Sequence, residues 1–248
     1  MENKENAVEL RNVEMHFNMS SERFESFKEY FLKLVKGKLH FEKFVAINNV
    51  SFDIKKGDVF GIVGLNGSGK STTLKIISGI LEPTKGTVET EGIIAPLIEL
   101  GAGFDMELTA RENIYLNGSV LGYSKKFMDE KFDDIVEFSE MKDFLDVPMK
   151  NYSSGMVARI GFAIATVTTP DILIVDEILA VGDFLFQQKC EERISKMMND
   201  DTTVIIVSHS IEQIERLCKH CIWLEHGKIK MIGDTAEVCE AYKHSQRE

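Results

Sequence analysis

The segment from Gly64 to Thr72 has the residue types and the spacing to bind phosphate. It reads G-L-N-G-S-G-K-S-T and matches the pattern G-x-x-x-x-G-K-[S/T]. Glycines let consecutive backbone N–H groups converge on phosphate oxygens, and the positive end of a following helix adds to the attraction. Lys70 supplies a cation and Ser71 a hydroxyl that binds Mg²⁺. The expected phosphate-binding residues are therefore Gly64, Leu65, Asn66, Gly67, Ser68, Gly69, Lys70, Ser71 and Thr72.

Charged and polar side chains also follow two apolar runs that are typical of buried strands. Asp176 and Glu177 come after 172–175, and His209 comes after 203–207. The carboxyl ends of parallel strands border the crevice where ligands bind, so Asp176 could hold Mg²⁺ through water and Glu177 could polarise an attacking water. An acidic pair could instead cap the next helix, and a lone His could be structural. Together with the phosphate-binding segment, the pattern favours catalysis.

The elements that must position these residues form an α/β pattern. Helical periodicity over about 109–168 predicts an inserted helical subdomain, and the alternation of strands and helices predicts a mostly parallel sheet next to an N-terminal antiparallel β region. Strands are expected at 8–17, 44–54, 59–63, 172–175 and 203–207, a β-like stretch at 87–98, helices at 71–80 and 184–198, and a final hairpin at 221–225 and 228–232 before a helix from Thr235.

Composition excludes several classes of function. The 29 Lys and Arg against 40 Asp and Glu give a formal charge of −11, which argues against binding to nucleic acid. No apolar run approaches the roughly 20 residues that span a bilayer, and no export signal opens the sequence, so a cytosolic chain is expected. Cys218 and Cys221 are spaced C-x-x-C without a second pair at zinc-site spacing, which favours packing between a helix and a strand over a metal site.

The order of the motifs resembles the ATP-binding cassette (ABC) family. After the phosphate-binding segment come Y-S-S-G-M at 152–156, I-L-I-V-D-E at 172–177, A-V-G-D at 180–183 and S-H at 208–209. The resemblance covers nearly the whole chain. It implies a single nucleotide-binding domain over 1–248 with the P-loop NTPase fold, which binds ATP and Mg²⁺ and hydrolyses ATP.

The same resemblance implies roles for residues on two chains. In a head-to-tail homodimer, the segment Ser153, Ser154 and Gly155 of one subunit would contact the terminal phosphate of the ATP held by the other. Glu177 would be the general base, His209 the switch residue near that phosphate, and Asp183 the residue that joins the two sites.

Two positions depart from the family pattern or leave it open. Glu99 stands where the family usually has Gln, so its role as a Mg²⁺ or water contact is open. The aromatic residue that stacks on adenine could be Phe17, Phe41 or Phe44, since an insertion follows the first strand. We favour Phe17 from its place at the end of that strand.

A narrower resemblance is to the ATPases of bacterial polysaccharide export, which handle O-antigen, teichoic acid and capsular glycans. The insertion at about 20–40 predicts an amphipathic helix with Phe24, Phe27, Phe31 and Leu34 on one face, suited to a membrane surface or a membrane partner. Packing on its own domain is the alternative. The implied partners are a second copy of the chain, a membrane permease and, through it, a lipid-linked polysaccharide, with the chain peripheral at the cytoplasmic face. The rival functions are service to a different ABC transporter and a soluble ABC-type clamp.

Overall fold

A computed structural model describes residues 5–20, 41–98, 100–101, 103–176, 182–198, 201–208 and 210–246. The apolar face of the amphipathic helix predicted at about 20–40, which runs from Phe24 to Leu34, lies outside the described residues, as do Glu99, Glu177 and His209.

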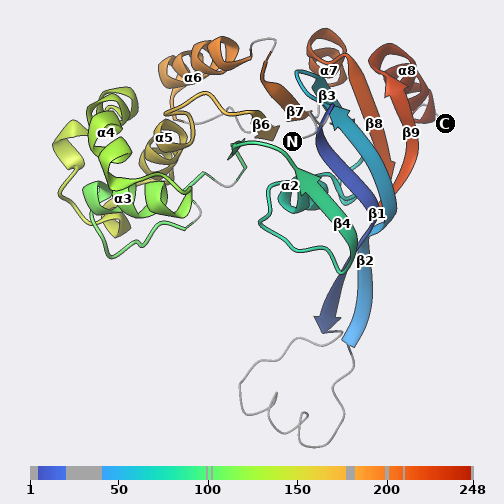
Figure 1. The fold of residues 1–248 in the computed structure, drawn as a ribbon, viewed down its shortest axis with the longest axis horizontal. Helices are drawn as coiled ribbons and strands as arrows, with labels where there is room; N and C mark the ends of the chain where they lie inside the picture. Colours follow the sequence, from blue (N-terminus) through green and yellow to red (C-terminus); the bar gives the residue numbers. More distant parts are fainter. Residues whose placement is uncertain are drawn as a thin grey trace, which may run out of the picture.

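The central sheet has the strand order β5, β6, β7, β3, β8 and β9 (Figure 1). Neighbouring strands from β5 to β8 are parallel, and β9 is antiparallel to β8. Their apolar, β-branched sequences are buried on both faces, as is usual for parallel strands. The bounds are β5 Ile94–Pro96, β6 Ile172–Asp176, β7 Thr203–Val207, β3 Val59–Val63, β8 His220–Glu225 and β9 Lys228–Asp234. The predicted mostly parallel sheet is confirmed.

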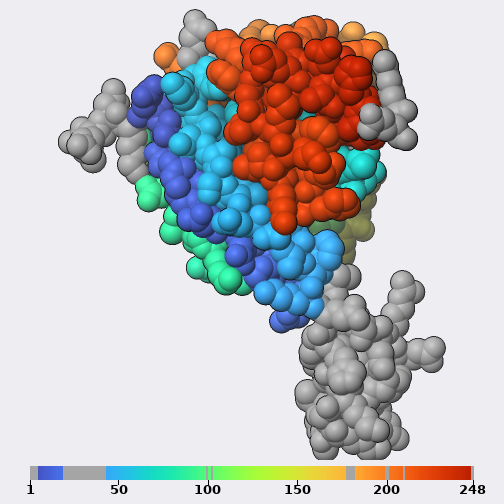
Figure 2. Space-filling view, turned by 90° about the vertical axis from the view of Figure 1, so that its right-hand side faces the viewer, coloured from blue at the N-terminus to red at the C-terminus, as the bar shows by residue number. Residues whose placement is uncertain are grey.

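A second, antiparallel sheet has the order β2, β1 and β4. Its strands are β1 Asn6–Ser20, β2 Phe41–Lys55 and β4 Lys85–Thr90. Figure 2 shows β1 and β2 running side by side down one face of the molecule, next to the C-terminal elements. The stretch 87–98, expected as one β-like unit, divides between the sheets, because β4 pairs with β1 and β5 pairs with β6. Gly92 turns the chain between them at a φ of 103°, and Ile93 N donates to Asp171 Oδ2 at 2.6 Å.

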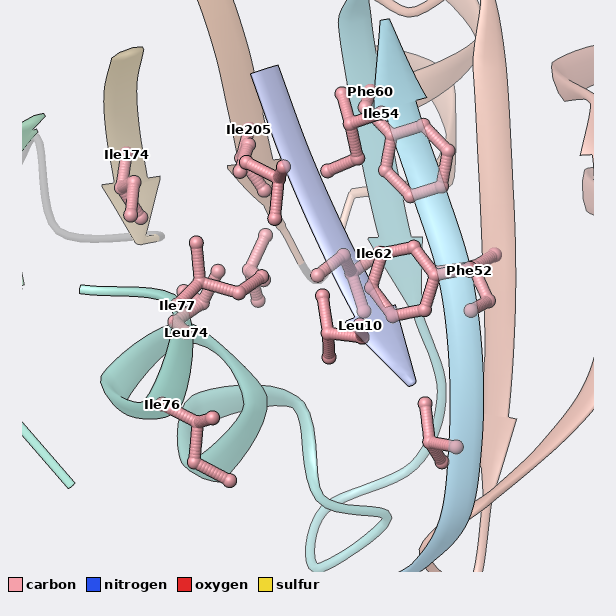
Figure 3. Close-up of a cluster of buried hydrophobic side chains, with 14 of the residues drawn as sticks. Leu10, Phe52, Ile54, Phe60, Ile62, Leu74, Ile76, Ile77, Ile174 and Ile205 are labelled. Carbon is pink, nitrogen blue, oxygen red and sulfur yellow. The ribbon is translucent and has the colours of Figure 1, made fainter. Parts of the chain in front are cut away.

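Helices cover both faces of the central sheet. Helix α2 (Lys70–Ile77) lies between the two sheets, where Leu74 and Ile77 pack against strand residues such as Leu10, Phe52 and Ile62 (Figure 3). The opposite face packs against a second cluster of buried residues from α6 Phe184–Met197, α7 Ile211–Leu217 and α8 Thr235–Ser245. The phosphate-binding segment is thus fixed at both ends, by a buried strand and by a buried helix.

A group of helices lies to one side of the sheets (Figure 1). It contains α3 Ala110–Val120, α4 Lys125–Ser139, α5 Ser154–Ala165 and the short 3₁₀ helices η1 Lys142–Phe144 and η2 Met149–Asn151. The group has its own apolar cluster, and Thr109 starts α3 with a reciprocal capping box to Glu112. Helix α5 joins the two regions, because Ile160 packs in the helical cluster while Phe162 packs under the sheet.

Candidate functional site

The phosphate-binding segment forms a tight turn between β3 and α2 that only glycine can make. Gly64 has a φ of 148° and Gly69 a φ of 107°, both in the region that L side chains rarely adopt. A Cβ on Gly64 would lie 2.3 Å from Leu224 O, and one on Gly69 would lie 2.9 Å from Ala46 O. The backbone of β2 and of β8 therefore presses on the turn and sets its shape.

Lys70 reaches back into this turn from the first position of α2. Its Nζ donates to Gly64 O at 2.7 Å and to Leu65 O at 3.0 Å, and the residue is only 7% exposed. Ser68 Oγ is buried without a hydrogen-bond partner among the described residues. A buried polar atom that lacks a partner is unfavourable, so the turn is prepared for a ligand that brings hydrogen-bonding groups.

A hollow of about 260 Å³ opens beside the turn. It is smaller than most small-molecule pockets, which run to about 300–1,000 Å³. The residues that line it are Phe44, Ala46, Asn66, Gly67, Gly69, Lys70, Ser71, Thr72, Asp176 and Val207. Asn66, Gly67, Gly69, Lys70, Ser71, Thr72 and Asp176 were expected at the site from the sequence.

Asp176 reaches the hollow because of the register of the central sheet. It pairs with Val207 of β7, and Val207 pairs with Ile62 of β3, so Asp176 lies on the rung that leads into the phosphate-binding turn. Ser71 lines the same hollow. Hydroxyl and carboxylate oxygens are the ligands that Mg²⁺ prefers, and this pair fits such an ion.

The aromatic residue at the hollow is Phe44, one of the three candidates from the sequence but not the favoured one. Phe44 lines the hollow and is 47% exposed. Phe17 lies opposite Phe44 in the β1–β2 pairing, but it packs against the buried cluster between the sheets. The side chain of Phe41 lies outside the described residues. The geometry thus favours Phe44 over our preference for Phe17.

The segment Ser153, Ser154 and Gly155 lies at the start of α5 and does not line the hollow. Ser153 caps α5, with its Oγ accepting from Met156 N at 3.3 Å, and both serines are exposed. Asp183 caps α6 in the same way, accepting from Phe186 N at 3.0 Å. The two helix starts are neighbours, since a Cβ on Gly155 would lie 4.0 Å from Gly182 Cα.

Comparison with known proteins identifies the chain. A sequence profile for the ABC transporter family matches residues 47–180. The chain is 44% identical to the O-antigen export system ATP-binding protein RfbB of Klebsiella pneumoniae over 213 residues, which is 86% of this chain and 85% of that protein. The chain belongs to the ABC transporter family. The resemblance expected from the motifs is confirmed, and within this family the chain is an ATP-binding ATPase.

A longer relative and two solved structures also resemble this ABC cassette. It is 38% identical to the teichoic acids export ATP-binding protein TagH of Bacillus anthracis, matching 95% of this chain but 42% of that protein. Its fold resembles the ATP-binding subunit of an ABC transporter, with a TM-score of 0.70 at 20% identity over 96% of this chain and 93% of the other. A dimeric ATP-binding cassette bound to ADP and Pi gives a TM-score of 0.68 at 23% identity, covering 92% and 98%.

Charge fixes the start of α6 in the cassette. Asp183 Oδ2 accepts from Arg159 Nη2 at 2.6 Å. The Phe186 N–H and, after it, the Arg159 guanidinium hold the pKa of Asp183 below its usual range. Asp183 is therefore an anion at neutral pH.

Several residues of the cassette were not singled out from the sequence. Ala46 and Val207 line the hollow, and Arg159 holds Asp183. No local motif marks them, because each acts through a contact between distant segments.

Cys218 and Cys221 are buried in the cluster under the sheet. Burial raises the pKa of Cys218 to about 12, so this thiol is neutral and packs as an apolar group.

Within the part of the chain that the structure describes, no helix has both the length and the hydrophobicity to cross a membrane.

Proposed function

We propose that the hollow beside Lys70 binds the phosphates of ATP with Mg²⁺ and that ATP is hydrolysed there. The observation that carries this proposal is the position of Lys70, Ser71 and Asp176 around one hollow, next to glycine turns that exclude side chains. The ammonium of Lys70 and the N–H groups of the turn bind phosphate oxygens. Ser71 and Asp176 supply oxygen ligands, and Mg²⁺, when bound, neutralises charge on the phosphates.

Four further residues contribute to ATP binding and hydrolysis in this proposal. Phe44 stacks on adenine, since it is exposed at the hollow's wall. Glu177 follows Asp176 directly and accepts a proton from the attacking water, and His209 contacts the terminal phosphate. Glu99 is proposed as a further Mg²⁺ or water contact. These roles follow the family pattern and the place of each residue in the sequence.

The ATP site is completed by a second copy of the chain. Ser153, Ser154 and Gly155 are at the N-terminus of α5, where backbone N–H groups attract phosphate, yet they do not line the hollow that holds Lys70. A head-to-tail homodimer brings this segment to the terminal phosphate held by the partner. Asp183, next to that segment in the fold, then lies between the two sites.

The work done by this hydrolysis is export of a lipid-linked polysaccharide of the O-antigen, capsular or teichoic acid type through a membrane permease. This part of the proposal is supported by the names of relatives at 38–44% identity, which are export ATP-binding proteins for O-antigen and teichoic acids. The chain then acts peripherally at the cytoplasmic face of the membrane.

An apolar hollow of about 180 Å³ between α3 and β5 is suited to the permease. It is lined in part by Ile93 and Val120, which are 51% and 70% exposed. Exposed apolar surface of this kind marks a binding site for a partner. The Phe-rich insertion at about 20–40 is a second contact, with the membrane surface or with the permease.

The test combines Glu177→Gln with an export assay. The amide keeps the shape of the side chain but cannot accept the water's proton, so ATP should bind, hydrolysis should be slower by about 10²-fold or more, and ATP should trap a dimer. In cells that carry the permease, the same variant should stop glycan export. Normal turnover in the variant would remove Glu177 from its role. Normal hydrolysis by the parent without any glycan export would instead point to a different transported substrate or to a soluble clamp.

A further inference from the structure

Ion pairs join the end of α4 to the middle of α5 and of α6, and the middle of α5 to the start of α6. Arg159 Nη1 donates to Glu140 Oε2 at 2.6 Å, and Arg159 Nη2 donates to Asp183 Oδ2 at 2.6 Å. Glu140 Oε1 accepts from Lys189 Nζ at 3.1 Å. Glu140, in the helical region, is thus connected to Asp183 through a single side chain.

Glu140 occupies a backbone conformation that does not suit it. It is the residue that ends α4, with φ 61° and ψ 27°, in the left-handed region where helices commonly end on Gly or Asn. Lys189 Nζ also donates to Phe138 O in the last turn of α4 at 3.0 Å. The residue in this strained position is therefore one whose carboxylate contacts Arg159 of α5 and Lys189 of α6. Strain that is retained in this way is typical of functional positions.

Arg159 is the middle member of this connection and is held tightly. Its side chain is 13% exposed, and its guanidinium lies 4.3 Å from the centre of the Phe186 ring. A Cβ on Gly182 would lie 3.1 Å from Arg159 Nε, so the turn before Asp183 rests directly on the guanidinium. The planar fork of Arg is needed to reach two carboxylates at once.

The two carboxylates of the cluster are anions at neutral pH. Lys189 and then Arg159 hold the pKa of Glu140 below its usual range, and Asp183 is an anion for the reasons given above. The side chain of Glu140 is half exposed, so its ion pairs alone contribute little to stability. Their consequence is positional, because they fix where α6 begins relative to α4.

We propose that Glu140 is a positioning residue of the ATPase, which orients Arg159 and through it Asp183 and the neighbouring start of α5. The proposal rests on the function proposed above, in which Asp183 and Ser153 act where two chains meet. Glu140 and Arg159 do not line the hollow at Lys70. Turnover should therefore depend on Glu140, whereas the affinity of one chain for ATP should not.

Glu140→Asn separates this role from a structural one. Asn tolerates the left-handed conformation and removes the charge, so the fold should be retained. We expect kcat to fall between about 10- and 100-fold, the range for a misplaced catalytic group, with the Kd for ATP within about 2-fold of the parent. The matched control is Glu137→Gln, on the exposed side of the same helix, which should keep the parental kcat.

Arg159→Lys provides the second measurement, since Lys keeps the charge but cannot hold both carboxylates. It should lower kcat as Glu140→Asn does, and the double variant should lose no more than the larger single effect, because both act through one connection. The proposal would be overturned if the double variant lost kcat by the product of the two single effects. It would also be overturned if a folded Glu140→Asn variant kept the parental kcat. If Glu140→Asn does not fold, a parental kcat in Arg159→Lys overturns it. A parent chain without ATPase activity would refute the proposed function instead.

Discussion

The hollow beside Lys70 and the exposed surface at Ser153 and Asp183 are built in different ways. The hollow is shaped by backbone, with glycine turns pressed against Ala46 O and Leu224 O and a nearly buried Lys70. The surface is shaped by side chains, since Ser153 and Asp183 each cap a helix and Arg159 holds Asp183 in place. In the function that we propose, the hollow of one chain binds the phosphates by itself. In the same proposal, the surface acts only together with a second chain.

This difference also separates affinity from turnover. Changes at the hollow should alter how tightly one chain binds ATP, and changes at the exposed surface should alter what two chains do with it. Four substitutions test this division, from the largest expected effect to the smallest.

Lys70→Ala should have the largest effect. It removes the cation that we place against the phosphates, together with the hydrogen bonds from Nζ to Gly64 O and Leu65 O. Hydrogen bonds to charged groups are worth about 1.5–3 kcal/mol each, so the affinity for ATP should fall by at least about 10- to 100-fold and hydrolysis should be lost. Calorimetric titration with ATP measures the affinity. Lys75→Ala, on the same helix but away from the hollow, is the control and should bind normally.

Ser153→Arg should leave ATP binding intact and abolish hydrolysis. The large cation would obstruct the start of α5, which we place against the partner's phosphate, whereas the hollow of the same chain is lined by other residues. Mixing this variant with Lys70→Ala chains should restore at most one intact site per dimer. ATP-induced dimerisation, followed by light scattering, provides the check. If Ser153→Arg instead lowered the affinity for ATP as much as Lys70→Ala does, Ser153 would act at the hollow of its own chain. Affinity and turnover would then not be separated between the two regions.

The two regions were not equally predictable from the sequence. The phosphate-binding segment and strands such as β3 and β7 lie where local pattern places them, because glycine spacing and buried apolar runs are contiguous signals. The division of 87–98 between two sheets depends on Asp171, which is far away in sequence. The choice of Phe44 over Phe17 depends on strand pairing across an insertion. Arg159 and Glu140 are likewise connected only by the fold.

Phe44→Ala tests the aromatic contact to adenine, which the sequence alone did not assign to Phe44. Aromatic stacking adds about 0.5–1.5 kcal/mol, so we expect ATP to bind about 2- to 10-fold more weakly. Phe17→Ala should leave the affinity nearly unchanged but lower the melting temperature, because Phe17 packs against the buried cluster. Titrations with ATP and with triphosphate alone separate the contributions, since only the former has a base to stack. If Phe17→Ala weakened ATP binding more than Phe44→Ala, Phe17 would be the adenine contact.

Thr109→Ala should have the smallest effect, and it should act on stability alone. Thr109 Oγ1 accepts from Glu112 N at 3.2 Å, while Glu112 Oε2 accepts from Thr109 N at 2.8 Å, so the substitution removes one half of the cap on α3. Loss of such a cap costs about 1 kcal/mol. In a chain of this length that lowers the melting temperature by about 2–4 °C.

The ATPase rate of the Thr109→Ala variant, measured well below its melting temperature, should equal that of the parent, because α3 contributes no residue to the hollow or to the exposed surface at Ser153 and Asp183. Ser124→Ala, which removes a simpler cap from α4, is the control and should lower the melting temperature by less. If Thr109→Ala instead lowered kcat without lowering the melting temperature, the helical region would act on catalysis through α3 as well as through Glu140. Turnover would then depend on α3 in addition to the connection from Glu140 through Arg159 to Asp183.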